Sequence, residues 1–496
     1  MADWAAGAEI FRRAPEKALV VAGGVYARLP GREVKGTGLG EAGGGTRGFP
    51  DTASGGGAGS RALTLPGGRA FMPAHTPMRL ILWGINYAPE PTGIAPFNTG
   101  LAEWLAARGH EVEVVTTFPY YPAWRKRPQD CGRLYRTDRS GGVTVRRCWH
   151  YVPARVTALR RMLHEASYLA TSLLRLLTLR RPDVLLVVSP PLPSGVPAWV
   201  VSRLWRRPYV FHVQDLQPDA AVGLGMLRPG RFTRLLYALE GLAYRKAAAV
   251  SGISDGMMDA FRAKGVEDAR RVFFPNWVAD TLPGAAGPVE RAAARAGFAV
   301  RQGLPADRPL LVYSGNVGMK QGLGVLLAAA AAAEVGGSDV PLQWIVAGDG
   351  AGREALVRQA GGRGLAALRF LPLQPDEAFV EMLVAADVCV ITQQAGTGQF
   401  FFPSKLLTVL GRARPVLAVA DADSELARAV REGGFGLVAS PDDPAAVAAA
   451  ARAMIAAGPE ALAEWGQRGL EWVGRYRRTA VLEEFERRLL QFARPR

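Results

Sequence analysis

Short apolar runs that alternate with helical segments are the feature that most constrains how this chain can fold. Residues 80–85 form an apolar run typical of a buried strand, and a loop rich in proline and glycine follows. Apolar residues then recur at helical spacing from 94 to 105, Gly109 ends that helix, and a second apolar run occupies 112–115. Such a β-loop-α-β unit predicts a parallel sheet with right-handed crossover connections.

The alternation continues through the chain and is interrupted at 280–297 by a stretch rich in Gly, Ala and Pro, which we interpret as the passage between two domains. The predicted fold class is α/β, with two facing doubly wound, Rossmann-like parallel-sheet domains. We expect them over 78–290 and 300–475, with a closing C-terminal helix over 476–496. Ligands of such sheets bind outside the carboxyl ends of the strands, so functional residues are expected in the loops there.

Residues 1–77 differ in composition from the rest of the chain. Their stretches GTGLGEAGGGTRG and DTASGGGAGS are rich in Gly and Ser and cannot bury enough apolar surface to become ordered. A disordered extension and a start codon assigned upstream of Met78 are the two favoured interpretations. A signal peptide around ALVVAGGVYA is disfavoured, because its apolar core is short and is broken by glycine.

The net charge of +16 favours anionic partners such as nucleotides or anionic lipid. Nucleic acid is not expected, because the sequence has no basic stripe interleaved with aromatic residues and no finger or helix-turn-helix pattern. No run approaches the roughly 18 apolar residues that a membrane-spanning helix needs. The three cysteines lie far apart without metal-ligand spacing, which indicates a reducing compartment; they are Cys131, Cys148 and Cys389.

The stretch YSGNVGMKQG follows the first predicted strand of the second domain. Gly315 and Gly318 would allow backbone N–H groups to approach an anion, and Lys320 adds a positive charge. The stretch matches neither the G-x-G-x-x-G nor the P-loop pattern. A glycine turn that serves packing alone is therefore the alternative.

The stretch FFFPSKLL predicts a helix with Ser404 as its N-cap and Lys405 in its first turn. A cation at a helix N-terminus opposes the helix dipole by about 0.3–1 kcal/mol, and a bound anion would offset that cost. We therefore predict an anion site at Lys405. The alternative is a lysine that points into water.

The stretch FHVQDLQPDAA places Asp215 at the carboxyl end of a predicted strand of the first domain, where a carboxylate can act on a substrate hydroxyl. His212 lies on the strand itself, and we interpret it as a core histidine. Asp219 is expected to cap the next helix. An earlier loop brings Glu90, Thr92 and Gly93 to the same cleft. For Thr92 and Gly93, a role in the turn alone is the alternative.

These loops occur in an order that resembles a known family. The stretches that carry the resemblance include INYAPEPTGIAPFNTGLAEWLAARGHEVEVVT, FPYYPAW, VVSPPLPSG, FHVQDLQPDAAVGLG, YSGNVGMKQGL, VAGDGAGREAL and FPSKLLTVL. From Met78 to its C-terminus the chain resembles the GT-B fold glycosyltransferases of family GT4. Within that family it resembles the branch of the colanic-acid glycosyltransferase of exopolysaccharide synthesis.

The resemblance implies a nucleotide-sugar donor, UDP- or GDP-linked, bound by the second domain, and an acceptor bound by the first. It implies transfer with retention of anomeric configuration, no cofactor and no essential metal. Asp215 is the predicted catalytic residue. The residues predicted to hold the donor are Gly93, Gly315, Asn316, Lys320, Gln321, Leu373, Ser404, Lys405 and Thr408.

The sequence departs from the family pattern at several of these positions. Asn316 and Gln321 stand where the family commonly has an Arg and a Lys, and Gln214 stands where a histidine usually precedes the acidic residue. The two glutamates that the family spaces along the donor loop would fall near Phe400 and Thr408, and neither is present. Since the second of them commonly holds the ribose, Thr408 would supply a weaker hydrogen bond in its place.

Residues 159–181, LRRMLHEASYLATSLLRLLTLRR, resemble a basic amphipathic helix that suits an anionic membrane surface. An ordinary helix packed against the sheet is the alternative. The expected partners are the donor, a polysaccharide or lipid-linked acceptor, and such a surface. The expected location is cytoplasmic, peripheral on the inner face of the plasma membrane.

The function that follows is a retaining glycosyltransferase that moves a sugar to a cell-surface polysaccharide intermediate. Two alternatives stay open at this point. One is a GT-B sugar-nucleotide epimerase, which would act with no acceptor present. The other is a non-catalytic relative that binds nucleotide sugars, which the missing glutamates motivate.

Overall fold

The computed structural model describes residues 77–91, 93–155, 157–223, 225, 227–335, 341–350, 352–398 and 404–493. The extension expected over 1–77 falls outside these residues except for its last position. Thr92, Phe400 and Pro403 also lie outside the described residues.

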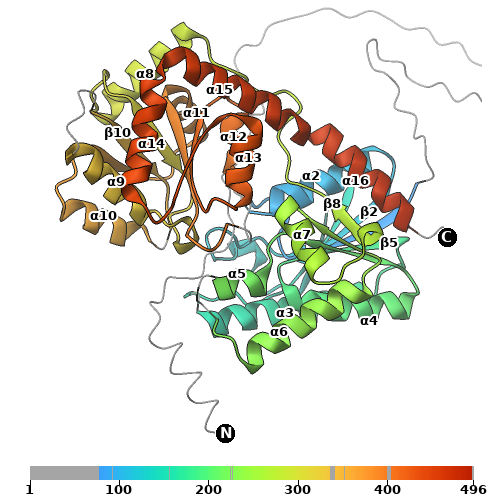
Figure 1. Cartoon of the computed structure of the whole chain (residues 1–496). Coiled ribbons are helices and arrows are strands. Elements are labelled where there is room, and N and C mark those ends of the chain that lie inside the picture. The colour runs from blue at the N-terminus through green and yellow to red at the C-terminus, as the bar shows by residue number, and fades with distance from the viewer. Residues whose placement is uncertain are drawn as a thin grey trace, which may run out of the picture. The chain divides into compact units, whose positions relative to one another are not determined.

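Two sheets confirm the predicted fold class (Figure 1). The strands of the first are β1 (Arg79–Trp83), β2 (Glu111–Thr117), β3 (Tyr135–Ser140), β4 (Val143–Cys148), β5 (Val184–Ser189), β6 (Tyr209–Val213), β7 (Ala249–Gly252) and β8 (Arg271–Phe273). Their order is β3-β4-β2-β1-β5-β6-β7-β8, and every pairing is parallel except that of β3 with β4. The central strands are buried on both faces, as expected of a parallel sheet covered by helices.

Helices cover both faces of the first sheet. They are α2 (Ala95–Ala107), α3 (Ala158–Leu177), α4 (Gly195–Trp205), α5 (Gln217–Gly223), α6 (Arg231–Lys246) and α7 (Asp255–Ala263). Buried side chains of α2 pack in the core on one face. Those of α3, α4, α6 and α7 pack together in the core on the other face. Single 3-10 turns lie at Pro128–Asp130, Leu192–Ser194 and Asp268–Arg270.

The second sheet is parallel throughout and has the order β11-β10-β9-β12-β13-β14. Its strands are β9 (Leu310–Ser314), β10 (Gln343–Ala347), β11 (Leu368–Leu371), β12 (Val388–Thr392), β13 (Val416–Val419) and β14 (Gly436–Ala439). Its helices are α8 (Pro288–Gln302), α9 (Gly324–Val335), α10 (Arg353–Gly361), α11 (Asp376–Ala385), α12 (Lys405–Leu410), α13 (Glu425–Gly433), α14 (Pro444–Ala456) and α15 (Gly458–Val473), with 3-10 turns at Met319–Gln321 and Gly474–Tyr476.

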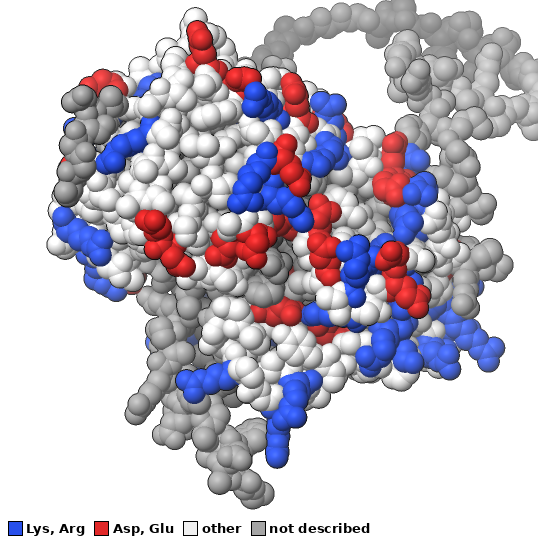
Figure 2. Space-filling view, viewed as in Figure 1, with Lys and Arg blue, Asp and Glu red and all other residues white. Residues whose placement is uncertain are grey.

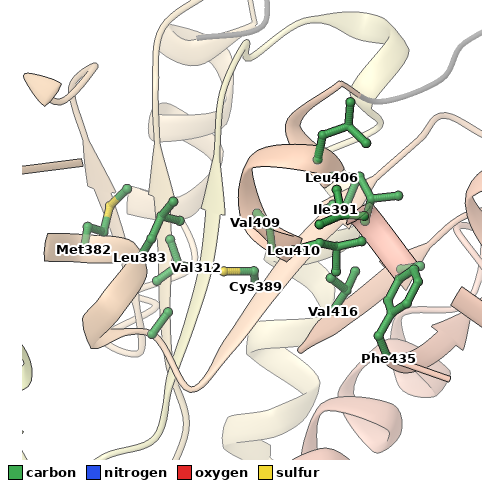
Figure 3. Close-up of a cluster of buried hydrophobic side chains, with 14 of the residues drawn as sticks. Val312, Met382, Leu383, Cys389, Ile391, Leu406, Val409, Leu410, Val416 and Phe435 are labelled. Carbon is green, nitrogen blue, oxygen red and sulfur yellow. The ribbon is translucent and has the colours of Figure 1, made fainter. Parts of the chain in front are cut away.

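The helices of the second domain also divide between the two faces of their sheet. Side chains of α9 and α14 pack on one face, and those of α11, α12 and α13 pack on the other. Figure 3 shows part of the second core, where Leu410 of α12 lies beside Ile391, Val416 and Phe435. The short helix α12 is therefore anchored through its apolar side, with Leu406, Leu407 and Leu410 fully buried.

The stretch interpreted as a passage between domains is helical from Pro288 onward, as α8. Its alanines favour helix, and proline is well tolerated in a first helical turn. Phe298 of α8 packs in the second core, and Arg295 donates to Asp387 beside the start of β12. This helix is thus packed on the second domain.

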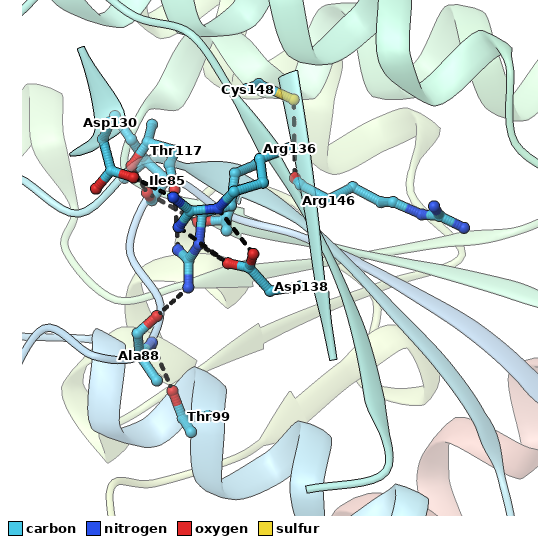
Figure 4. Close-up of polar contacts among 11 residues, drawn as sticks. Ile85, Ala88, Thr99, Thr117, Asp130, Arg136, Asp138, Arg146 and Cys148 are labelled. Carbon is cyan, nitrogen blue, oxygen red and sulfur yellow. Dashed lines mark hydrogen bonds and ion pairs between the residues drawn. The ribbon is translucent and has the colours of Figure 1, made fainter. Parts of the chain in front are cut away.

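The antiparallel hairpin of β3 and β4 was not predicted from the sequence. Its turn is Gly141-Gly142, and both glycines have positive φ, 58° and 77°, as tight hairpin turns require. Arg147 of β4 pairs with Asp138 of β3 at 2.7 Å and so joins the two strands. Arg136 of β3 contacts both Asp130 and Asp138 (Figure 4). Burial raises the pKa of Asp138, but hydrogen bonds from Arg136 and Arg147 outweigh it and lower that pKa.

The last helix, α16 (Arg478–Phe492), packs in the core of the first domain, beside α2 (Figure 1). Its Phe485 stacks on Phe274 with ring centroids 3.6 Å apart. Glu486 is only 1% exposed, and its carboxylate accepts from His110 at 2.9 Å and from Trp104 at 3.2 Å. It also pairs with Arg108 at 2.5 Å.

No single helix in the described ranges is long and apolar enough to cross a membrane. Two consecutive helical segments, Pro444–Ala456 and Gly458–Tyr476, are together long and apolar enough to do so, but they are bent by 104° relative to each other.

We predict that Glu486→Ala lowers the free energy of unfolding by about 3 kcal/mol, because it leaves Arg108 and His110 facing a buried site without their carboxylate. Burial raises the pKa of Glu486, but the hydrogen bonds from Arg108 and His110 outweigh it and lower that pKa. The stabilisation is therefore present at neutral pH and is lost as the pH falls through the lowered pKa. Urea denaturation followed by tryptophan fluorescence measures the change.

The matched control is Glu484→Ala on the same helix. Glu484 is 52% exposed on its side chain and pairs with Arg487 at the surface, so its loss is expected to cost less than about 1 kcal/mol. Equal destabilisation by the two variants would contradict the proposed role of Glu486.

Candidate functional site

A pocket opens at the carboxyl ends of the strands of the first sheet. Its lining comes from the loops after β1, β2, β5 and β6 and from one side of α3. The lining residues are Ile85, Asn86, Gly93, Ile94, Tyr120, Tyr121, Trp124, Arg161, His164, Glu165, Pro190, Pro191 and Asp215. Two residues predicted from the sequence, Gly93 and Asp215, thus line one pocket.

The two loops of the pocket that follow β1 and β2 are joined by Glu90. Its carboxylate accepts hydrogen bonds from the backbone N–H groups of Tyr120 at 2.9 Å and Tyr121 at 3.0 Å, and from the Asn86 amide at 2.8 Å. Burial raises the pKa of Glu90 in spite of these bonds. Glu90 therefore positions the aromatic loop, and its oxygens are already engaged.

Asp215 is the carboxylate of the pocket with an unengaged oxygen. The residue is 7% exposed, and its buried Oδ2 makes no hydrogen bond. Burial raises the pKa of Asp215, while the positive charges of Lys320 and Arg161 oppose that rise. By contrast, Glu165 accepts from Arg161 at 3.0 Å.

The polar residues near Asp215 in the sequence hold the structure together through hydrogen bonds and ion pairs. His212 contacts the Ser251 hydroxyl through Nδ1 at 2.9 Å and the Gln214 amide through Nε2 at 2.8 Å. Burial lowers the pKa of His212 to about 3, so the ring is neutral and its interpretation as a core histidine holds. Asp219 does not serve mainly as a helix cap, because its carboxylate pairs with Lys264.

Aromatic rings form one wall of the pocket. These residues were not predicted as site residues from the sequence. The ring centroids of Tyr120 and Trp124 lie 5.4 Å apart, and those of Trp124 and His164 lie 5.3 Å apart. His164 is buried, which lowers its pKa to about 4. The stretch FPYYPAW was the available signal for this wall, and α3 supplies the rest.

In the second domain, the loop after β9 is built around Lys405. The Lys405 ammonium donates to the Tyr313 hydroxyl at 2.7 Å and lies 4.0 Å from the centroid of that ring. Gly315, with φ of 138°, makes this approach possible, since a Cβ there would lie 2.9 Å from the ammonium. The structure thus brings together Gly315 and Lys405, two residues that the sequence placed at the same site.

The backbone N–H groups predicted to face an anion are already engaged. The N–H of Gly315 donates to Ala347 at 2.9 Å, and that of Gly318 donates to the Gln321 side chain at 3.1 Å. Asn316 donates to the same Gln321 oxygen at 3.4 Å. Asn316 and Gln321 therefore shape the loop from within, and its positive charge comes from lysine side chains.

A second glycine loop, after β10, packs against the first one backbone to backbone. Val317 donates to Asp349 at 2.9 Å, and Gly352 donates to Val317 at 2.9 Å. A Cβ at Gly348 would collide with the Gly315 carbonyl oxygen. The glycines of the VAGDGAGREAL stretch thus allow close packing of two loops at one edge of the sheet.

Lys320 of this loop and Lys405 of α12 share an electrostatic environment. Burial, and then the charge of Lys320, lower the pKa of Lys405 to about 7. Burial also lowers the pKa of Lys320, and the charge of Asp215 opposes that change. A second positive charge beside a desolvated ammonium is unfavourable unless an anion is near.

Three other residues were predicted to hold the donor: Ser404 and Thr408 belong to α12 or its N-cap, and Leu373 follows β11. Ser404 occupies the N-cap position of α12, but its side chain makes no capping hydrogen bond, and the helix has only 6 residues. Thr408 lies half-buried on α12. Leu373 follows β11 and is 51% exposed. The helix-dipole argument is thus weak here, and Tyr313 holds Lys405 in place.

Within the described residues, no cluster of three or more His, Cys, Asp or Glu side chains is arranged to hold a metal ion. Asp421 and Asp423 follow β13 with D-x-D spacing, and the Asp421 carboxylate accepts from the Gly396 N–H at 2.8 Å, which joins the loops after β12 and β13.

Two family models match this chain. The glycosyl transferase 4-like domain matches residues 92–277, and the glycosyl transferases group 1 domain matches residues 308–457. The chain is 35% identical over 358 residues to the putative colanic acid biosynthesis glycosyl transferase WcaI of Escherichia coli K12, covering 70% of this chain and 85% of that protein.

Solved structures share the fold. Sucrose-phosphate synthase from Thermosynechococcus elongatus superposes with a TM-score of 0.64 at 18% identity, covering 83% of this chain and 98% of that one. Anabaena HepE, solved in complex with UDP-glucose, superposes with a TM-score of 0.59 at 16% identity, covering 84% and 100%. With two parallel-sheet, Rossmann-like domains and these matches along its length, the chain belongs to the GT4 family of GT-B fold glycosyltransferases.

Proposed function

We propose that this glycosyltransferase moves a sugar from a UDP- or GDP-linked donor, with retention of anomeric configuration, to a lipid-linked intermediate of an exopolysaccharide. The observation that carries the proposal is the pair Lys320 and Lys405 on one side and the buried carboxylate of Asp215 on the other. The name of the Escherichia coli relative supports the exopolysaccharide, and the UDP-glucose complex of HepE supports a nucleotide-sugar donor.

The donor diphosphate would lie against Lys320 and Lys405. The negative charge of a diphosphate would stabilise the two ammonium groups together, and it would raise the lowered pKa of Lys405. The same lysines would stabilise the charge that develops on the departing nucleoside diphosphate as the bond to the sugar breaks. We propose that the lysines supply this stabilisation without an essential metal or cofactor.

The acceptor would occupy the pocket of the first domain. Its aromatic wall, with Trp124 and Tyr121, offers flat apolar surfaces against which the C–H faces of a sugar ring can pack. Asp215 would accept a hydrogen bond from the attacking hydroxyl or from a sugar hydroxyl and so orient it. Its unengaged Oδ2 supports this role.

The ribose would be held without the glutamate that the family commonly uses. Thr408 lies one helical turn after Lys405 on α12, which places both residues on the same side of that helix. A hydroxyl at this position can make one neutral hydrogen bond to a ribose hydroxyl. We therefore propose weaker ribose binding than a carboxylate would give.

We further propose that the enzyme works in the cytoplasm, peripheral to the inner face of the plasma membrane. A lipid-linked acceptor there would be reached from the same side as the nucleotide donor.

The experiment that tests the function begins with thermal stabilisation of the full chain by UDP, GDP and their common sugar conjugates, with and without magnesium. A shift specific to one base selects the donor for a transfer assay with a lipid-linked saccharide extract, and the anomer of the product is read by NMR. Donor isomerised without acceptor would support an epimerase instead. No shift with any nucleotide would overturn the proposal.

We predict that nucleoside diphosphate affinity falls as the pH rises above 7. The diphosphate needs Lys405 charged, and with its pKa at about 7 in the free protein this lysine must take up a proton on binding at higher pH. The dissociation constant should rise by up to about tenfold per pH unit. Calorimetry in buffers of different ionisation enthalpy measures both affinity and proton uptake.

Lys405→Ala should weaken binding by about 2 kcal/mol, or roughly thirtyfold, and abolish the proton uptake. Lys246→Ala removes an exposed lysine at the end of α6 and is the control, for which both quantities should match the parent protein. Proton uptake that persists in Lys405→Ala would exclude this lysine as its source.

We predict that Asp215→Asn keeps donor affinity within about twofold and lowers the transfer rate by roughly a hundredfold. The neutral amide oxygen accepts a weaker hydrogen bond from the hydroxyl than a carboxylate does, and it cannot take up the proton. Donor affinity is read by calorimetry and transfer by radiolabelled product. A variant that loses donor binding to the same extent as transfer would place Asp215 on the donor side.

A further inference from the structure

The solvent-facing side of α3 is apolar along its whole length. Its exposed positions recur every three or four residues, which forms one stripe on a helix. Three leucines of the stripe, Leu159, Leu163 and Leu174, are 63%, 52% and 62% exposed. The complete stripe is Leu159, Leu163, Ala166, Ala170, Leu174 and Leu177.

The opposite side of α3 fixes the orientation of this stripe. Tyr168 is 1% exposed, and its hydroxyl donates to the Val115 carbonyl at 3.3 Å. Ser172 accepts from the Trp83 indole at 3.0 Å. The helix therefore cannot rotate to bury its leucines without breaking buried hydrogen bonds.

The neighbouring helices of the same layer extend the apolar surface. Since α3, α4 and α6 pack on one face of the sheet, their outer sides share one surface, which we name the α3–α4–α6 face. On α4, Val200 and Leu204 are 52% and 61% exposed, and on α6, Phe232 and Leu235 are 49% and 53% exposed. Of the sixteen exposed large apolar side chains in the described residues, nine lie on these three helices, so they are gathered and not scattered.

The charges beside this surface are almost all positive. The arginines on or next to the three helices include Arg160, Arg175, Arg180, Arg203, Arg206, Arg231 and Arg234. The helices contain two carboxylates, Glu165 paired with Arg161 and Glu240 buried against Lys264. In Figure 2 the lower edge of the molecule, where Figure 1 draws α3 and α6, shows blue side chains and hardly any red.

We propose that the α3–α4–α6 face docks on an anionic lipid bilayer. Exposed leucine and phenylalanine side chains would enter the interface, and the arginines would contact the headgroup phosphates. A second copy of the chain fits less well, because two such faces would bring like charges together. We therefore propose a lipid surface as the partner, and the experiment below distinguishes lipid binding from self-association.

The docked helix also lines the pocket. One side of α3 presents Arg161, His164 and Glu165 to the pocket, while Leu159 and Leu163 of the same turns face outward. The pocket therefore lies within one helix width of the docking surface. This part rests on the proposed function, since it lets an acceptor joined to a lipid reach the pocket while its lipid stays in the bilayer.

The test is flotation of the full chain with vesicles of phosphatidylcholine alone or mixed with phosphatidylglycerol. We expect binding to the anionic vesicles, and weaker binding at high salt. The variant Leu159→Ser/Leu163→Ser/Leu174→Ser should lose roughly tenfold or more in vesicle affinity. Because these side chains are exposed, it should unfold at the same temperature as the parent protein.

The matched control is Val289→Ser/Val300→Ser on α8, whose valines are 84% and 82% exposed. It should bind vesicles as the parent does. Equal loss in both variants, or no binding of the parent, would overturn the proposal. Light scattering that finds a dimer lost in the leucine variant, with vesicle binding unchanged, would assign the face to self-association. None of these measurements uses a nucleotide. Their results therefore test membrane docking independently of whether the protein binds a nucleotide-sugar donor.

Discussion

Parallel strand pairing is the constraint on which the rest of this structure depends. Each parallel pair needs a crossover that covers a sheet face, so every strand except β3 points the same way within its sheet, and the loops that follow these strands emerge at one edge. The loops after β1, β2, β5 and β6 form the pocket of the first domain in this way. The loops after β9 and β10 meet at the corresponding edge of the second sheet, where Gly315 and Gly348 allow their backbones to touch.

The alternation of apolar runs and helical segments was enough to predict both sheets, because a buried parallel strand is apolar on both faces. The β3–β4 hairpin was not predicted because β3 lies at the edge of the sheet and carries charged side chains, of which Asp138 pairs with Arg147 of β4. The helix α8 was interpreted as part of a linker because glycine and proline are typical of irregular chain, although proline suits the first turn of a helix and alanine its interior.

The site was predictable where chemistry follows chain position and not where it depends on tertiary contacts. Asp215 and Lys405 could be named because each follows a strand or opens a helix. The partner of Lys405 could not, since Tyr313 is far away in sequence and looks like an ordinary core residue of β9. Glycine loops suggested free N–H donors, whereas the structure uses those donors to join the loops to each other. The contribution of α3 to the pocket was hidden in the same way, inside a stretch that reads as a surface helix.

The C-terminal helix carries a consequence for synthesis. Phe485 and Leu489 of α16 belong to the same core as Leu80 and Leu82 of β1, although nearly the whole chain separates them. During translation domains generally fold in order from the N-terminus, as their residues emerge. Here the first domain to leave the ribosome cannot complete its core until the last helix has been made. The unfinished apolar face under α16 thus stays open while the entire second domain is synthesised, and the earliest part of the chain is the last to become fully packed.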